Sequence, residues 1–247
     1  MTSPAPRTGR GALLLVAALL AALVVGVLLG RALPDAPGEQ SADVGFARDM
    51  STHHQQAVAM AYEAIQTAPS PEVRQLAVDV ASTQGNQVGR MQALLGQWGV
   101  PLRGSGPVMA WMEGTAGHAE HLRQQEQGRT MPGMATAAEL ARLGSETGEV
   151  FEVDFLQLML RHHEGGLEMA ETGAERVGDE QLRSLARAIA TSQRSESQVL
   201  TDLLAARGAQ PLPAGTAAET GTGTAAGTTG ATGAATDAAT AGAGAGA

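Results

Sequence analysis

FARDMSTHHQQAVAMA begins at Phe46, and FLQLMLRHHEGGLEMA begins at Phe155. Both stretches place a Phe, a Met, two adjacent His and a Met-Ala pair at the same spacing, 109 residues apart. Four of the six His of the chain lie in these two stretches. The agreement continues at the same offset as far as Gly99 and Gly208, so the sequence predicts a tandem duplication.

Each copy predicts two helices, because apolar residues recur at intervals of three and four and no strand-like alternation is present. Ser70 and Asp179 are suitable N-cap residues, and Gly99 and Gly208 suit the left-handed position just past a helix end. We therefore expect an all-α fold, a ferritin-like antiparallel four-helix bundle built from two tandem helical hairpins. The helices are expected at residues 43–67, 71–98, 150–176 and 180–207.

The duplicated bundle is expected over residues 41–213. Repeat one covers 43–101, a linker containing Met and His covers 102–149, and repeat two covers 150–211. The linker is too long for a simple turn, and Thr136 with Glu139 predicts a capping box that begins a short helix. Residues 214–247 are almost only Ala, Gly and Thr, so we expect a disordered, flexible tail.

Residues 12–30 are apolar or Gly without interruption, with Arg7 and Arg10 before them and Arg31 after. A helix of that length rises ~28 Å, about the thickness of a hydrocarbon core. This predicts a transmembrane signal anchor with a cytoplasmic segment at 1–11 and a short linker at 31–40. The body would then lie outside the cytoplasm on a single-pass membrane protein; the alternative is a cleaved signal peptide and a secreted protein.

The charge balance and the absence of Cys limit the partners. Beyond residue 31 the chain carries 13 Arg against 25 Asp and Glu, so it would repel nucleic acid and favour cations. With no Cys there is no disulfide framework and no thiolate ligand. A soft-metal site in this chain must therefore use Met sulfur and His nitrogen, and the oligomeric state is left open.

The doubled His with flanking Met predict a metal site. Imidazole with thioether suits copper or silver ions, and thioethers bind without deprotonation in oxidising surroundings. The duplication can turn the first and third long helices toward one interior. Candidate ligands are then His53, His54, His162, His163, Met50, Met60, Met159 and Met169. Secondary candidates lie in the linker: Met109, Met112, His118, His121, Met131 and Met134.

Two alternatives compete with a metal site. Met on a helical stripe commonly fills a core, and the His pairs could form a polar network with Asp43, Glu152, Gln84 or Gln193. The protein would then be a non-catalytic structural or interaction module. Catalysis is less favoured, because Glu-x-x-His of di-iron bundles is absent and His-Glu-x-x-His would need His at Leu167. A metal-dependent oxidase is the weaker alternative.

The two stretches, extended to DVGFARDMSTHHQQAVAMA and to MPGMATAAELARLGSETGEVFEVDFLQLMLRHHEGGLEMA, resemble the bacterial family called domain of unknown function 305. Its hallmark is a repeated Phe-x-x-x-Met-x-x-His-His followed by Met-Ala, and the resemblance covers about residues 41–213. It implies an exported ferritin-like bundle, and some members resemble periplasmic copper-binding proteins with Met and His ligands. The resemblance carries the ligand role to the eight positions above and to Met131 and Met134.

The second motif departs from the first where Gly165-Gly166 replace Gln56-Ala57. The two half-sites are therefore not expected to be identical. Taken together, the sequence predicts an extracytoplasmic protein that binds or buffers copper or silver ions through Met and His.

Overall fold

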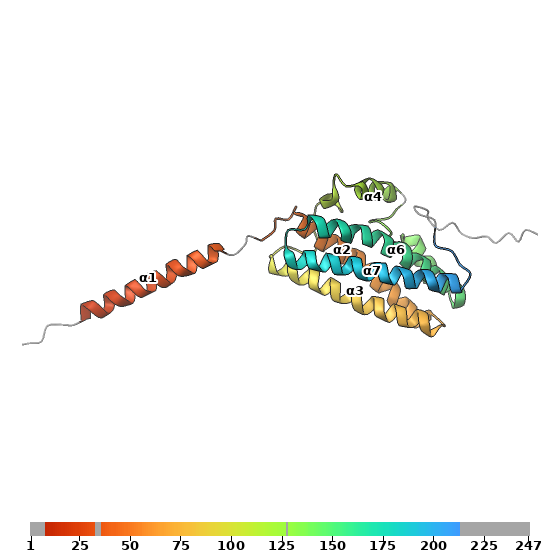
Figure 1. Ribbon diagram of the computed structural model, residues 1–247, viewed down its shortest axis with the longest axis horizontal. Helices are drawn as coiled ribbons and strands as arrows, with labels where there is room; N and C mark the ends of the chain where they lie inside the picture. The colour runs from red at the N-terminus through yellow and green to blue at the C-terminus, as the bar shows by residue number, and fades with distance from the viewer. Residues whose placement is uncertain (1–7, 33–35, 127, 213–247) are drawn as a thin grey trace, which may run out of the picture. The chain divides into compact units, whose positions relative to one another are not determined.

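The computed structural model describes residues 8–32, 36–126 and 128–212, and this part of the chain contains helices and no strands. Four long helices form a bundle: α2 (Ala42–Thr67), α3 (Pro71–Gln97), α6 (Gly148–Arg176) and α7 (Glu180–Ala206). α2 packs on α3, α6 packs on α7, and the two hairpins meet where α2 contacts α6 and α3 contacts α7 (Figure 1). The predicted all-α bundle of two hairpins is confirmed, with each helix end within two residues of its expected position.

Most of the local signals for helix ends act as expected. Asp179 accepts a hydrogen bond from the backbone N–H of Leu182. Ser70 occupies the N-cap position of α3, directly before Pro71, but its hydroxyl makes no cap hydrogen bond and accepts from Arg207 instead. Gly99 and Gly208 have φ of 69° and 65°, in the left-handed region that glycine adopts without a steric penalty. These residues end α3 and α7 at equivalent points of the two repeats.

The two repeats are joined by reciprocal contacts that reflect the duplication. The Asp43 carboxylate on α2 accepts from the backbone N–H of Asp179 at the start of α7. The Glu152 carboxylate on α6 accepts from the N–H of Ser70 at the start of α3. Each acid therefore satisfies a helix N-terminus of the other repeat, where the positive end of the helix dipole favours a carboxylate.

The bundle buries two hydrophobic clusters. The first contains Phe46, Met50 and Met169, and the second contains Met60, Phe155 and Met159. Met50 therefore lies with Met169, and Met60 with Met159, which shows that α2 and α6 run in opposite directions. His53 and His162 lie on the two helices between these Met positions.

The linker between the repeats has more structure than we expected. A single 3₁₀ turn, η1 (Ala110–Met112), and α4 (Ala116–Glu126) precede the predicted short helix, α5 (Ala137–Leu143). Thr136 caps α5 as predicted: its hydroxyl accepts from Glu139 N–H, and the Glu139 carboxylate accepts from Thr136 N–H. Nothing in the spacing of apolar residues around 110–126 indicated η1 or α4.

The N-terminal segment differs from its expectation. Residues Thr8–Ala32 form a helix, α1, whose described side chains at 11–26 are exposed. In the part of the chain that the structure describes, no helix has both the length and the apolar character needed to cross a bilayer. The predicted transmembrane anchor over residues 12–30 is therefore not supported. The side chains of its last four residues, 27–30, are outside the described part of the structure. The predicted tail at 214–247 lies outside the described residues.

Candidate metal centre

His53 and His162 meet at the centre of the bundle. Their ring centroids lie 3.8 Å apart with the planes at 38°, and both side chains are fully buried. The two residues occupy equivalent positions of the repeats, on α2 and α6. The duplication thus brings the two motifs together, as the sequence predicted, because the helices that carry them pack against each other.

The hydrogen bonds of these rings fix which nitrogen carries a proton. His53 Nε2 lies 2.9 Å from the carbonyl oxygen of Pro132, and His162 Nε2 lies 3.0 Å from the carbonyl oxygen of His53. A carbonyl oxygen only accepts, so Nε2 of each ring must donate. Nδ1 of each neutral ring is then left with a free lone pair, and it has no hydrogen-bond partner.

His54 points about 100° away from His53 around α2, and it faces α3 instead of α6. Its Nε2 lies 2.8 Å from the amide oxygen of Gln87. Its Nδ1, like those of His53 and His162, is buried without a partner. In three rings of the centre, one nitrogen therefore donates to a protein oxygen and the other is buried with a free lone pair. Neighbouring protein oxygens orient metal-ligating His in the same way.

His163 is different, because both of its ring nitrogens have partners. Nδ1 lies 2.9 Å from the carbonyl oxygen of Met159, and Nε2 lies 2.7 Å from the Glu196 carboxylate. Both oxygens are acceptors when Glu196 is ionised, so both nitrogens must then carry protons. With Glu196 ionised, His163 has no nitrogen lone pair left for a metal.

The difference between the half-sites comes from one position of the duplication. Gln87 in repeat one corresponds to Glu196 in repeat two, and each lies 33 residues after its His partner. A neutral amide leaves His54 uncharged, whereas a carboxylate stabilises a charged His163. Neither Gln87 nor Glu196 was predicted as a partner of a His ring, although the 109-residue offset relates the two residues as it relates the His.

Burial keeps the three other rings uncharged. It lowers the pKa of His53 to about 4 and the pKa of His54 to about 3. Burial, followed by repulsion from His53, holds the pKa of His162 well below its ordinary value. Neutral imidazole is the form that binds a metal ion, so these rings are in the ligating state at neutral pH.

Two buried glutamines border the centre. Gln84 and Gln193 are each 1% exposed, and neither the amide nitrogen nor the amide oxygen of either has a hydrogen-bond partner. A Cβ built on Gly166 would lie 2.7 Å from the Gln193 amide nitrogen and 3.0 Å from His53 Cε1. Gln193 therefore adjoins the His53 ring, and the interior here contains more polar atoms than the protein satisfies.

The linker covers one side of the centre. The Pro132 carbonyl that accepts from His53 lies so close to α6 that a Cβ on Gly165 would lie 2.2 Å from its oxygen. Gln56 bonds both backbone groups of Ala135, which fastens the same loop to α2. At the equivalent positions of the two motifs, Gly165 leaves room for the loop to pass close to α6, and Gln56 binds the loop to α2. These different roles explain why the two motifs differ there.

The candidate methionines are all buried. Met50 and Met169 belong to the first hydrophobic cluster, and Met60 and Met159 belong to the second. One pair of Met therefore lies on each side of the layer formed by the His53 and His162 rings, which we call the His layer. The secondary candidates Met109, Met112, Met131 and Met134 also belong to the first cluster.

The linker histidines lie apart from the motif pairs. His118 and His121 are 6.1 Å apart between ring centroids, and Nδ1 of each has no partner. Burial lowers the pKa of His121. These two rings therefore form a second group of free imidazole nitrogens, on α4 and not on the bundle helices.

The four polar residues that could have formed a core network with the His pairs do not bond to the His rings. Asp43 and Glu152 bond helix starts, and Gln84 and Gln193 bond nothing, so none of the four is a hydrogen-bond partner of a His ring. Asp43 and Glu152 lie near the ends of the bundle, too far along their helices to reach its centre.

Within the described residues, no group of three or more His, Asp and Glu side chains is arranged to hold a metal ion.

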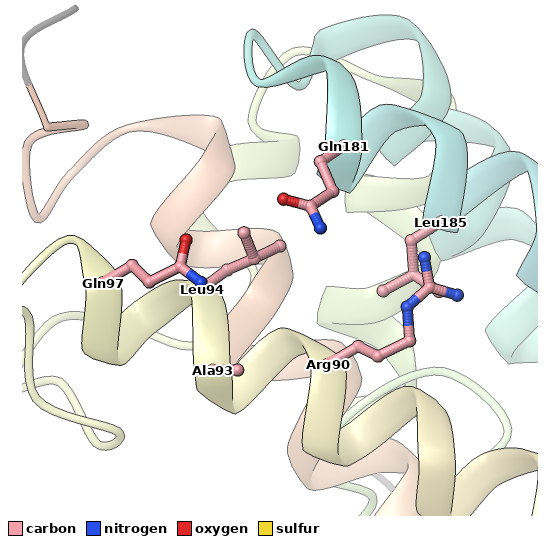
Figure 2. A pocket seen from close by; sticks show the side chains of 6 residues that line it. All are labelled: Arg90, Ala93, Leu94, Gln97, Gln181 and Leu185. Atoms are coloured by element: carbon pink, nitrogen blue, oxygen red, sulfur yellow. The ribbon is translucent and has the colours of Figure 1, made fainter. Parts of the chain in front are cut away.

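A small cavity of about 100 Å³ lies away from this centre, between α3 and α7. Figure 2 shows Arg90 and Gln97 extending from α3 toward Gln181 and Leu185 of α7. None of the candidate ligands lines this cavity.

Comparison with known proteins agrees with the duplicated motif. A family model described as domain of unknown function (DUF305) matches residues 43–204 and 167–242. A DUF305 protein from Streptomyces coelicolor, inferred to be secreted, is 45% identical with a TM-score of 0.63, covering 71% of this chain and 99% of that one. A DUF305 fragment from Deinococcus radiodurans is 30% identical with a TM-score of 0.55, covering 70% and 99%.

CopM in its Cu(I)-bound form has a similar fold, with 22% identity, a TM-score of 0.51 and coverage of 67% of this chain and 96% of that one. No curated protein matches the chain. The family match spans both His motifs and the linker between them, and the chain therefore belongs to the DUF305 family.

Proposed function

We propose that this protein binds copper or silver ions outside the cytoplasm, through imidazole nitrogen and thioether sulfur at the centre of the bundle. The observation that carries the proposal is the set of three buried Nδ1 atoms, of His53, His54 and His162, that have no protein partner. A buried polar atom without a partner costs about 1–3 kcal/mol, and a bound soft cation would remove that cost.

The Met residues complete the donor set. Met50 and Met169 lie at one end of the His layer, and Met60 and Met159 at the other. Thioether sulfur and neutral imidazole together select copper or silver over magnesium or calcium. His163, whose nitrogens are both bonded, acts in this proposal as a positioning residue for the centre.

Two relatives support the location and the metal. The Streptomyces coelicolor protein, 45% identical, is inferred to be secreted, which favours a place outside the cytoplasm for this chain. CopM, whose fold is similar, has a Cu(I)-bound form. The absence of Cys agrees with both, because thioethers resist the oxidation that would inactivate thiols there.

The test is a competition titration of the metal-free full chain with Cu(I) and Ag(I). Two matched double variants replace sulfur at constant volume: Met50→Leu with Met169→Leu, and Met60→Leu with Met159→Leu. A third variant, His53→Asn with His162→Asn, removes two free nitrogens. We expect the His variant and at least one Met variant to weaken binding by at least about tenfold, the loss of roughly 1.4 kcal/mol.

Equal uptake by all variants would contradict the proposal. The His rings would then serve only as a polar network in the core, for which their Nε2 hydrogen bonds are the supporting observation. Substitution of His118 and His121 by Asn tests the linker candidates separately. Oxygen consumption on adding Cu(I) would indicate that the bound metal is also oxidised.

A further inference from the structure

Gln84 and Gln193 occupy equivalent positions of α3 and α7, 109 residues apart. Each side chain is almost completely buried, and the amide nitrogen and oxygen of both lack a hydrogen-bond partner. Burying a polar group without a partner opposes folding, so neither amide stabilises the bundle through hydrogen bonds. An apolar side chain of similar volume would fill the same space without that penalty. The two amides are therefore candidates for binding a ligand inside the bundle.

Both amides are directed toward the His layer. Gln84 lies three residues before Gln87, whose amide oxygen bonds His54, and residues three apart project from the same face of a helix. Gln193 precedes Glu196 by the same interval on α7, and Glu196 bonds the second His motif. The two helices that hold the outer rings therefore also turn one free amide each to the interior.

Gly166 leaves room for one of these amides beside His53. A Cβ built on Gly166 would lie 2.7 Å from Gln193 Nε2, 2.8 Å from Gln193 Oε1 and 3.0 Å from His53 Cε1. Cε1 is bonded to Nδ1, the ring nitrogen that has the free lone pair. The Gln193 amide and the His53 ring therefore border the same small volume. Gln84 and His162 form the equivalent pair under the 109-residue offset.

The donors of these two pairs differ in chemistry from the Met sulfur atoms. The described His, Asp and Glu side chains form no group of three that could hold an ion, so an ion here needs ligands of other kinds. An amide oxygen has lone pairs to donate, and it is a harder ligand than a thioether. A set of imidazole nitrogen and oxygen donors suits Cu(II), which takes square-planar or tetragonal geometry.

We propose that the amide oxygens of Gln84 and Gln193 are ligands of Cu(II) at the centre, together with the free Nδ1 atoms of His53 and His162. This inference rests on the metal binding proposed above and adds the oxidation state to it. The amides serve Cu(II), and the Met sulfur atoms on either side of the His layer serve Cu(I) and Ag(I).

The experiment titrates the metal-free full chain with Cu(II) and, separately, with Ag(I). Gln84→Leu and Gln193→Leu should each weaken Cu(II) binding by at least about tenfold, because each removes one oxygen ligand, and should change Ag(I) affinity by less than about threefold. Gln198→Leu is the matched control. It removes an exposed glutamine of α7 that bonds Asp202, and it should bind both ions as the wild-type chain does.

Two further measurements separate ligation from packing. Electron paramagnetic resonance of the Cu(II)-loaded wild-type chain should show mixed nitrogen and oxygen ligation, and the spectrum should change in both Gln84→Leu and Gln193→Leu. Thermal unfolding of the metal-free variants should show no loss of stability, because the amides that they remove make no hydrogen bond.

The outcomes distinguish this inference from the proposed function on which it rests. Ag(I) binding by the wild-type chain, with Cu(II) affinity and spectrum unchanged in both glutamine variants, overturns the inference and leaves the proposed function standing. Ag(I) binding without any Cu(II) binding, or a wild-type spectrum without oxygen ligation, has the same meaning. A chain that binds neither ion contradicts both.

Discussion

His53 and His162 lie with their ring centroids 3.8 Å apart, and His162 Nε2 donates to the backbone carbonyl of His53. Two imidazolium rings at this distance would repel each other strongly in a dry interior, and burial lowers the pKa of each ring, so both are neutral at pH 7. The pairing therefore creates two lone pairs in the core, and it does so only because the equivalent helices of the two repeats pack together.

The protonation states of the four motif histidines are the first prediction. We expect His53, His54 and His162 to be neutral with the proton on Nε2, and His163 to carry protons on both nitrogens beside Glu196. Long-range ¹H–¹⁵N spectra of the metal-free protein at pH 7 distinguish these forms. Glu196→Gln, which copies Gln87 of repeat one, should turn His163 into a neutral ring. A doubly protonated His54 in the unaltered protein would contradict this assignment.

The same substitution should lower stability. Replacing Glu196 by Gln exchanges a charge-assisted hydrogen bond to a buried ring for a neutral one, and we expect a loss of about 1–3 kcal/mol in the free energy of unfolding. Urea unfolding measures it. Glu180→Gln, at an exposed position of the same helix, is the control and should change stability by less than about 1 kcal/mol.

Stability of the metal-free protein should fall as the pH is lowered below the ordinary His pKa of 6.5. In this range the His residues of the unfolded chain take up protons, whereas in the folded protein the pKa of His53 is about 4 and that of His54 is about 3. Each ring contributes a loss of roughly 1.4 kcal/mol per pH unit in this window.

Three carboxyl groups oppose this trend. Burial raises the pKa of Asp49 to about 6, that of Glu146 to about 7 and also that of Glu164, so all three take up protons more readily in the folded state and favour it as the pH falls. Four rings, counting His121 with its lowered pKa, outweigh three acids, and the net slope should be a loss. Urea unfolding between pH 7 and pH 5 tests it: His54→Gln should flatten the slope and Asp49→Asn should steepen it. A wild-type stability that rises on acidification would refute the argument.

Gly166→Ala should destabilise the fold by about 1–3 kcal/mol, because the added Cβ would press on Gln193 and His53 in a filled core. Gly85→Ala is the matched control. Gly85 lies in the interior of α3 with nothing within 4 Å of the built Cβ, so the change should stabilise by about 0.5–1 kcal/mol. Thermal melts of the two variants, moving in opposite directions, would confirm that the centre is packed to its limit.

The buried pair of Arg161 and Glu139 should matter far more than an exposed one. The Arg161 guanidinium bonds both Glu139 oxygens at 2.8 and 2.7 Å, and Glu139 also caps α5. Glu139→Gln should cost about 3–5 kcal/mol, because it removes the carboxylate charge from a buried ion pair while the Arg161 charge stays buried. Glu171→Gln removes the exposed partner of Arg194 and should cost less than about 1 kcal/mol by chemical denaturation.

By itself the sequence determined the helices, the duplication and the burial of the His pairs, because these depend on local spacing and on a repeat that is visible along the chain. Gly99, Gly208 and the Thr136 capping box are local signals of the same kind, and each acts where it was predicted. The sequence did not determine the partners of the rings.

Only the tertiary structure decided that Pro132 meets His53, that Gln87 and Glu196 differ in their effect on the two half-sites, and that Nδ1 is the free nitrogen. These contacts join residues 33 to 79 positions apart, and they depend on how the helices cross and where the linker returns. Periodicity indicates which face of a helix is buried, but the atom that a ring meets is set by the path of another segment.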